Sequence, residues 1–141
     1  MEEKTGVKEK GISDKDWFLQ SLVEACNQGM ELTITLLVKG IVISGTLVGG
    51  NNYFVNIAEN FKTITKNPDE TEKTYSHFKK IGEDIYTIKE DEVISPPTFI
   101  HIKGARIFHP GQKPMPKDKT SFWRGKIDSV DGFYIGEFLI S

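Results

Sequence analysis

The sequence lacks several features that mark secreted, membrane-spanning or metal-binding proteins. Its 141 residues include a single cysteine, Cys26, so no disulfide can form within the chain, and a reducing compartment such as the cytoplasm is expected. No apolar run approaches the roughly 18 residues that a membrane helix needs. The longest candidate, Ile34 to Val48, is interrupted by Lys39 and Gly40. The start of the chain, MEEKTGVKEKG, has no apolar core of a secretory signal.

Charge of either sign is not in large excess, but it is unevenly placed. The net charge of -2 and the pI near 5.9 give no overall reason to expect nucleic acid as a partner. Residues 66–93 hold eight acidic and five basic side chains, whereas residues 103–126 hold seven basic and one acidic. These segments can be solvated surface, or they can attract copies of the protein to one another or to a charged surface.

Length and composition predict one domain with a short tail. A chain of this size can bury one core and is too short for two comfortable ones. Residues 1–12 contain too few apolar groups to offset the entropy lost on ordering, so we expect a disordered N-terminal tail. Residues 13–141 are expected to form a single α+β domain.

Two patterns predict the first helix and the first hairpin. Apolar residues recur at helical spacing from Phe18 to Cys26, which predicts a helix over residues 14–28. Between Leu32 and Val48 the period changes to two, which predicts two strands joined by a turn at Lys39-Gly40. The sequence Ser44-Gly45-Thr46 in the second strand indicates a bulge or close packing against a neighbour.

The middle of the chain returns to a helical period. An apolar stripe from Tyr53 to Ile64 predicts a helix, with Asn51 or Asn52 as its cap. A second helix is predicted over residues 70–89, although Gly82 interrupts its pattern. An Sm-like barrel is an alternative, because residues 32–60 and 102–108 resemble its two halves. In that fold the segment after Tyr53 would be a strand.

The C-terminal part predicts further strands. Residues 99–108 form a strand pattern with a kink at Gly104, and residues 110–119 form a surface loop rich in proline. Residues 121–140 predict a second hairpin that turns at Asp131-Gly132. The elements together predict an α+β fold. Its antiparallel sheet of about five strands, two hairpins plus one strand, would carry helices on one face or close partly into a small barrel.

No residues assemble into an active site or a cofactor site. Cys26 lies on an apolar helical stripe and is expected to be a buried thiol. His77, His101 and His109 lack metal-ligand spacing, so no metal is expected. The acidic residues lie in polar segments, where carboxylates titrate normally. We therefore predict a protein that is not an enzyme.

The second predicted hairpin offers candidate contact residues instead. Trp123, Arg124, Lys126 and Tyr134 are of amphipathic or basic types that recur in protein interfaces, and we predict that they contact protein partners. Residues 138–141 are predicted to be strand, and an uncovered edge strand invites another chain. Basic residues also interleave with aromatic ones here, but the acidic character of the whole chain argues against nucleic acid as a partner.

Three segments together resemble one known family. Residues 38–61 (VKGIVISGTLVGGNNYFVNIAENF), 99–111 (FIHIKGARIFHPG) and 122–136 (FWRGKIDSVDGFYIG) look like the gas vesicle accessory protein U family of bacilli (GvpU-like) in order and rough spacing. The resemblance covers most of the chain from Trp17 onward and includes no catalytic signature.

The resemblance implies a cytoplasmic accessory factor without enzymatic activity. It further implies self-association, contact with the gas vesicle shell or other gas vesicle proteins, and clustering of vesicles. Members of the family carry a polar tail after the final strand, whereas this sequence ends at Ser141. Weak multivalent association would then depend on the N-terminal dozen residues or on residues 66–93. The alternative function is an Sm-like oligomeric module that binds RNA.

Overall fold

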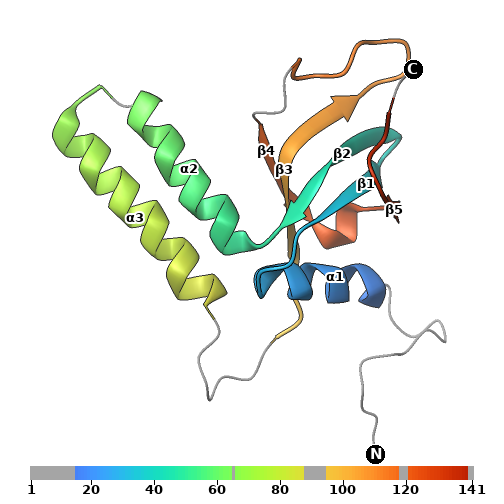
Figure 1. The fold of residues 1–141 in the computed structure, drawn as a ribbon, viewed down its shortest axis with the longest axis horizontal. Coiled ribbons are helices and arrows are strands. Elements are labelled where there is room, and N and C mark those ends of the chain that lie inside the picture. The colour runs from blue at the N-terminus through green and yellow to red at the C-terminus, as the bar shows by residue number, and fades with distance from the viewer. Residues whose placement is uncertain (1–14, 65, 88–94, 118–120, 140–141) are drawn as a thin grey trace, which may run out of the picture.

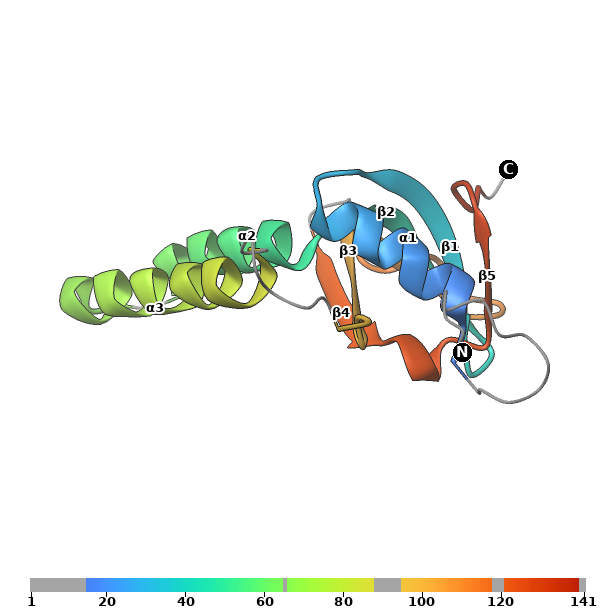
Figure 2. The ribbon, with the colours of Figure 1, turned by 90° about the horizontal axis from the view of Figure 1, so that it is seen from below.

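The computed structural model describes residues 15–64, 66–87, 95–117 and 121–139, and its fold is α+β as predicted. One antiparallel sheet carries a helix across one face, and a helical hairpin extends away from it (Figures 1 and 2). The predicted tail over residues 1–12 lies outside the described residues. The elements, in chain order, are α1 (Trp17–Asn27), β1 (Leu32–Val38), β2 (Ile41–Val48), α2 (Gly50–Ile64), α3 (Pro68–Tyr86), β3 (Phe99–Phe108), β4 (Phe122–Lys126), the 3₁₀ helix η1 (Ile127–Ser129) and β5 (Gly132–Ile135).

The sheet has five strands in the order β4-β3-β2-β1-β5, and all neighbours are antiparallel. β4 and β5 occupy opposite edges and do not pair with each other, so the sheet is not closed into a barrel. The segment after Tyr53 is helical, since it lies within α2. Both findings remove the structural basis of the Sm-like alternative.

The first hairpin is confirmed in its turn and in its bulge. β1 and β2 pair from Leu32 opposite Leu47 to Val38 opposite Ile41. Lys39 and Gly40 both have positive φ angles, 51° and 82°, as a tight hairpin turn requires. The pairing of β2 with β3 shifts register between Ser44 and Thr46, where the sequence predicted a bulge.

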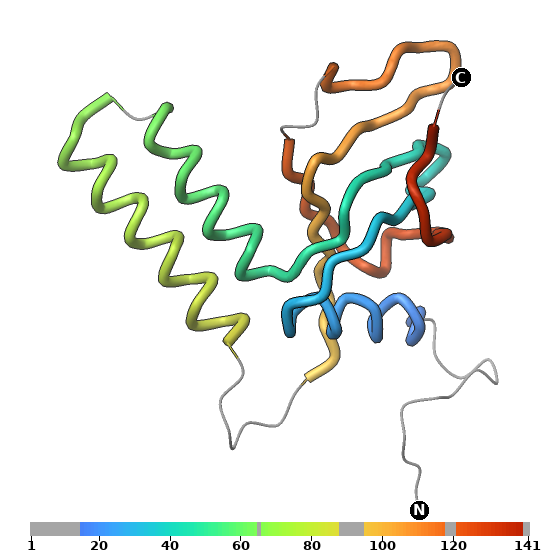
Figure 3. Tube along the Cα trace, in the orientation of Figure 1, coloured from blue at the N-terminus to red at the C-terminus, as the bar shows by residue number. Residues whose placement is uncertain are grey.

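The predicted second hairpin is wrong. β4 pairs with β3, and β5 pairs with β1 at the far side of the sheet, so the chain crosses from one edge to the other between them (Figure 3). The crossing contains η1, whose Ile127 is buried in the core. Gly132 has no positive φ and is the first residue of β5, so Asp131-Gly132 is not the predicted turn. Phe138 and Leu139 follow β5 without strand structure.

The core lies between α1 and one face of the sheet. Helix α1 is shorter than predicted because Asp16 caps it, its side chain accepting a hydrogen bond from the Leu19 N–H at 2.9 Å. Gly29, with φ 115°, follows the helix end, where a glycine readily adopts the left-handed conformation. The helix buries Leu19, Val23 and Cys26 against a set of apolar side chains from the sheet and η1: Ile34, Leu36, Ile43, Leu47, Ile100, Ile102, Ala105 and Ile127.

Helices α2 and α3 form an antiparallel hairpin, which we call the arm. Gly82 does not break α3, because it lies where the two helices approach closely. A Cβ at this position would lie 2.8 Å from Cβ of Phe54 and 2.9 Å from Oδ1 of Asn51. The predicted asparagine caps are wrong: α2 begins at Gly50, whose N–H donates to Oδ1 of Asn27 in α1. Further along the arm, Phe61 stacks on Phe78 with ring centroids 4.8 Å apart.

Candidate protein interaction surfaces

Strand β4 carries three of the four predicted contact residues at one edge of the sheet. Trp123 is half-buried on the core face, where its indole occupies the space that a side chain at Gly125 would fill. Arg124 and Lys126 project from the opposite face and are exposed. Within the described residues β4 pairs only with β3. This edge, with Arg124 and Lys126, is called the basic edge below.

Arg124 also makes contacts within the protein. Its Nε donates a hydrogen bond to Nε2 of His101 at 3.1 Å, and its guanidinium lies 3.7 Å from the ring centroid of Phe99. His101 is fully buried, and its Nδ1 has no hydrogen-bond partner among the described residues. Because Nε2 accepts, a neutral imidazole carries its proton on Nδ1. Burial first, and then the charge of Arg124, lower the pKa of His101 from 6.5 to about 4.

Rings from the arm surround His101. The ring centroids of Tyr53 and Tyr86 lie 4.7 Å and 5.6 Å from that of His101, and Phe54 lies at 6.3 Å. Burial is also the main reason why the pKa of Tyr53 is raised. We call these residues the root of the arm, because they join it to β3 and β4. The root shows that Arg124 has a structural role beside the predicted contact role.

Strand β5 forms the other edge and is apolar on both faces. Tyr134 is 47% exposed and Ile135 is 57% exposed. Leu37 of β1 lies opposite Gly132, on the same face as Tyr134, and is exposed as well. The exposed acidic side chains of Asp131 and Glu137 flank this strand in the sequence. The apolar edge is defined here as Leu37, Tyr134 and Ile135.

The structure therefore separates the predicted contact residues. Trp123, Arg124 and Lys126 lie together, whereas Tyr134 lies across the whole sheet. Four strand spacings, about 19 Å measured along the sheet, separate the two edges. Sequence reasoning missed Leu37 and Ile135, because pairing β5 with β4 hides which strands are at the edges. The sequence carried no clear signal for them, because the exposure of Tyr134 and Ile135 is visible only once the position of β5 in the sheet is known.

The remaining candidate chemistry concerns the single cysteine and clusters of possible metal ligands. Cys26 is buried, and its thiol donates to the carbonyl oxygen of Leu47 at 3.6 Å. Burial raises the pKa of this thiol to about 11, which disfavours the nucleophilic thiolate. In the part of the chain that the structure describes, no group of three His, Cys, Asp or Glu side chains could hold a metal ion. None of the described helices is long and apolar enough to cross a membrane.

A comparison with known protein families finds a match over most of the chain. A family model described as "Gas vesicle protein GvpU-like" matches residues 16–138. Neither the search of curated proteins nor the search of solved structures gives a match. The matched span begins at the cap of α1 and ends after β5, so it includes every helix and strand described above.

Proposed function

Because this chain belongs to the GvpU-like family of gas vesicle proteins, we propose that it is a non-enzymatic accessory protein that self-associates and clusters gas vesicles in the cytoplasm. Membership of the family supports an accessory role in gas vesicles, and the proposal concerns how that role is carried out. The observation that carries the proposal is a single sheet with two unlike edges, one basic and one apolar.

Edge strands carry backbone groups that can pair with another chain. The basic edge presents Arg124 and Lys126, and the apolar edge is flanked by Asp131 and Glu137, so opposite edges of two copies attract. A contact between unlike edges is heterologous, and each added copy leaves one edge of each kind available. Unless a ring closes, such assembly is open-ended, which suits a factor that gathers large particles.

The partners in this proposal are other copies of the chain and the gas vesicle shell or its associated proteins. An assembly of several copies presents several vesicle-binding surfaces at once. Multivalent attachment of this kind raises the overall affinity without any new contact. Weak contacts between single copies would therefore be enough to hold vesicles together.

Replacing Ile135 by Asp is expected to weaken self-association by about tenfold or more, because an exposed apolar side chain that becomes buried in a contact contributes roughly 1.5–3 kcal/mol. Tyr134→Asp is expected to act in the same direction. Light-scattering mass at low and high salt measures the assembly, and mixing with purified gas vesicles followed by flotation measures attachment and clustering. The matched control is Ile64→Asp, since Ile64 is also an exposed isoleucine, 65% exposed, and it is the last residue of α2, at the end of the arm far from the sheet (Figure 1).

The basic edge is tested by Lys126→Glu, which leaves the root of the arm intact. We expect smaller assemblies at low salt and little difference from the wild type at high salt, where the charges are screened. If Ile64→Asp lowers the mass as much as Ile135→Asp, or if neither edge variant changes it, the two edges are not the contact surfaces.

A further inference from the structure

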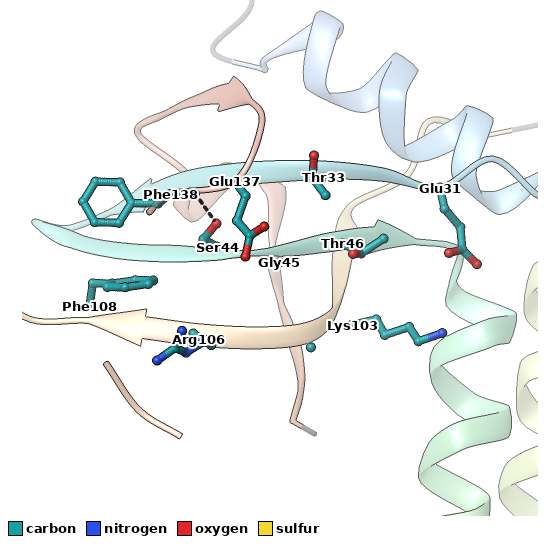
Figure 4. A pocket seen from close by; sticks show the side chains of 11 residues that line it. Glu31, Thr33, Ser44, Gly45, Thr46, Lys103, Arg106, Phe108, Glu137 and Phe138 are labelled. Atoms are coloured by element: carbon teal, nitrogen blue, oxygen red, sulfur yellow. Dashed lines mark hydrogen bonds between the residues drawn. The ribbon is translucent and has the colours of Figure 1, made fainter. Parts of the chain in front are cut away.

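A polar groove lies on the sheet face opposite α1, beside the segment that follows β5 (Figure 4). The backbone of this segment is fixed to the sheet, because the Phe138 N–H donates to Oγ of Ser44 and Oγ1 of Thr35 donates to the Gly136 carbonyl oxygen. The groove encloses about 240 Å³. Its lining combines two cations, three hydroxyls, two carboxylates, two phenyl rings and two glycines: Lys103, Arg106, Thr33, Ser44, Thr46, Glu31, Glu137, Phe108, Phe138, Gly45 and Gly104.

The bulge between β2 and β3 brings the two cations to the same face. Residues three apart in a regular strand point to opposite faces, so Lys103 and Arg106 would normally be separated by the sheet. Here Lys103 lies opposite Thr46 and Arg106 lies opposite Ser44, and the extra residue is absorbed at Gly104, whose φ is 63°. Bulges often re-aim a side chain toward a functional site.

The bulge also depends on a second glycine. A Cβ on Gly45 would lie 2.8 Å from the carbonyl oxygen of Lys103 and 2.5 Å from a methyl carbon of Ile102. No residue with a side chain fits there without moving the backbone of β3. The sequence therefore uses two glycines to hold Lys103 and Arg106 over one groove.

Neither cation is neutralised within the described residues. Lys103 and Arg106 form no ion pair there, and Nε of Arg106 is buried without a hydrogen-bond partner. A buried donor that loses water and gains no partner is costly, so an acceptor at this position would be stabilised. The Ser44 hydroxyl already forms hydrogen bonds with Thr35 and the Phe138 N–H. Within the described part of the chain, no side-chain hydrogen bond involves the hydroxyls of Thr33 and Thr46.

The end of the groove that lies beside Arg106 carries two aromatic rings. Phe108 and Phe138 meet edge to face, with ring centroids 4.9 Å apart. The guanidinium of Arg106 lies 5.7 Å from the Phe108 ring. A ligand that fills the groove would therefore contact both charged donors and aromatic rings, and the volume limits it to a small molecule.

We propose that this groove binds the phosphate group of a small phosphate monoester. A phosphate monoester carries a charge of about -1.5 to -2 near pH 7 and three acceptor oxygens, so it can engage Arg106 and a neighbouring hydroxyl. The exposed, flexible side chain of Lys103 extends away from Arg106 in Figure 4, and it would swing toward the bound phosphate. A carboxylate has a single charge and two oxygens, and it would leave one cation without a partner. The Glu31 carboxylate lies at the Lys103 end of the groove in Figure 4, so it disfavours an anion there and favours the Arg106 end. The ester group then lies toward Phe108 and Phe138.

The test measures binding of phenyl phosphate, inorganic phosphate and benzoate to the full chain by isothermal titration calorimetry at constant ionic strength. We expect phenyl phosphate to bind more tightly than benzoate. Arg106→Gln and Lys103→Gln should each weaken phenyl phosphate by about tenfold or more, because each removes a charged hydrogen-bond donor. The matched control Lys73→Gln, an exposed cation on the arm and outside the groove, should change the affinity by less than about twofold.

Lys103 is exposed, so its variant is expected to fold even if Arg106→Gln does not, and circular dichroism checks both. Equal binding of inorganic phosphate and phenyl phosphate would still support a phosphate site, with no contribution from the rings. The proposal is overturned if benzoate binds as tightly as phenyl phosphate, if Lys103→Gln behaves like Lys73→Gln, or if the wild type binds none of the three anions. None of these measurements depends on self-association or on gas vesicles.

Discussion

Acidification from pH 7 to pH 4 is expected to lower the free energy of unfolding by up to about 3 kcal/mol through His101. In the folded protein the pKa of His101 is about 4, below its ordinary value of 6.5, because the ring is buried and Arg124 lies beside it. Between pH 6.5 and pH 4, His101 binds a proton in the unfolded chain but not in the folded chain. The contribution of neutral His101 is therefore complete above pH 6.5 and is lost as the pH falls toward 4.

The measurement is denaturant unfolding of the wild type and of His101→Gln at pH 7 and pH 5. A glutamine can still accept the hydrogen bond from Arg124 but does not titrate. The wild type should lose about 2 kcal/mol more than the variant between these pH values. The other groups that face His101 are the rings of Tyr53, Phe54 and Tyr86, and tyrosine does not change charge in this range. Equal losses in the two proteins would show that His101 is not the group responsible.

Replacing Gly49 by Ala is expected to cost about 3 kcal/mol, which corresponds to a fall of roughly 10 °C in the melting temperature. Gly49 joins β2 to α2 and packs directly on the end of α1. An added Cβ would lie 2.5 Å from the carbonyl oxygen of Cys26 and 3.0 Å from Cα of Asn27. These are backbone atoms that cannot rotate away, so the junction must move and strain the hydrogen bond from the Gly50 N–H to Asn27.

The matched control is Gly132→Ala. Gly132 has no atom within 4 Å of an added Cβ and no positive φ, so its replacement should change the stability by less than about 1 kcal/mol. Urea unfolding of both variants at pH 7 gives the comparison. If Gly49→Ala is as stable as Gly132→Ala, the backbone of α1 does not exclude a side chain at position 49.

The sequence predicted correctly those helices and strands that are specified by neighbouring residues in the chain. The period of two in residues 32–48 and the turn at Lys39-Gly40 specify the first hairpin, because the turn residues lie directly between the strands. The stripe from Tyr53 to Ile64 specifies a helix in the same way. For these segments the neighbours in the sequence are also the neighbours in space.

The rest depends on distant partners. Asp131-Gly132 looks like a hairpin turn in the sequence. In the structure, Ile127 is buried in the core, and the chain crosses from β4 to the other edge of the sheet, where β5 pairs with β1. The apolar period of a segment predicts that it forms a strand, but it does not predict which strand it pairs with or whether it lies at an edge of the sheet. The phosphate groove escaped sequence reasoning for a related reason. Lys103 and Arg106 share a face only because a bulge across two strands shifts their register.

The arm acts as a lever. Its longer helix, α3, has 19 residues and so extends about 28 Å from the rings that join it to the sheet. A turn of roughly 10° at those rings would move the far end, near Pro68, by about 5 Å. Small rearrangements around His101 would thus be amplified at the tip. A partner bound at the tip would lie nearly 30 Å from the sheet. The length of the arm therefore determines how far from the sheet a partner is held, and how far the tip moves when the base rotates.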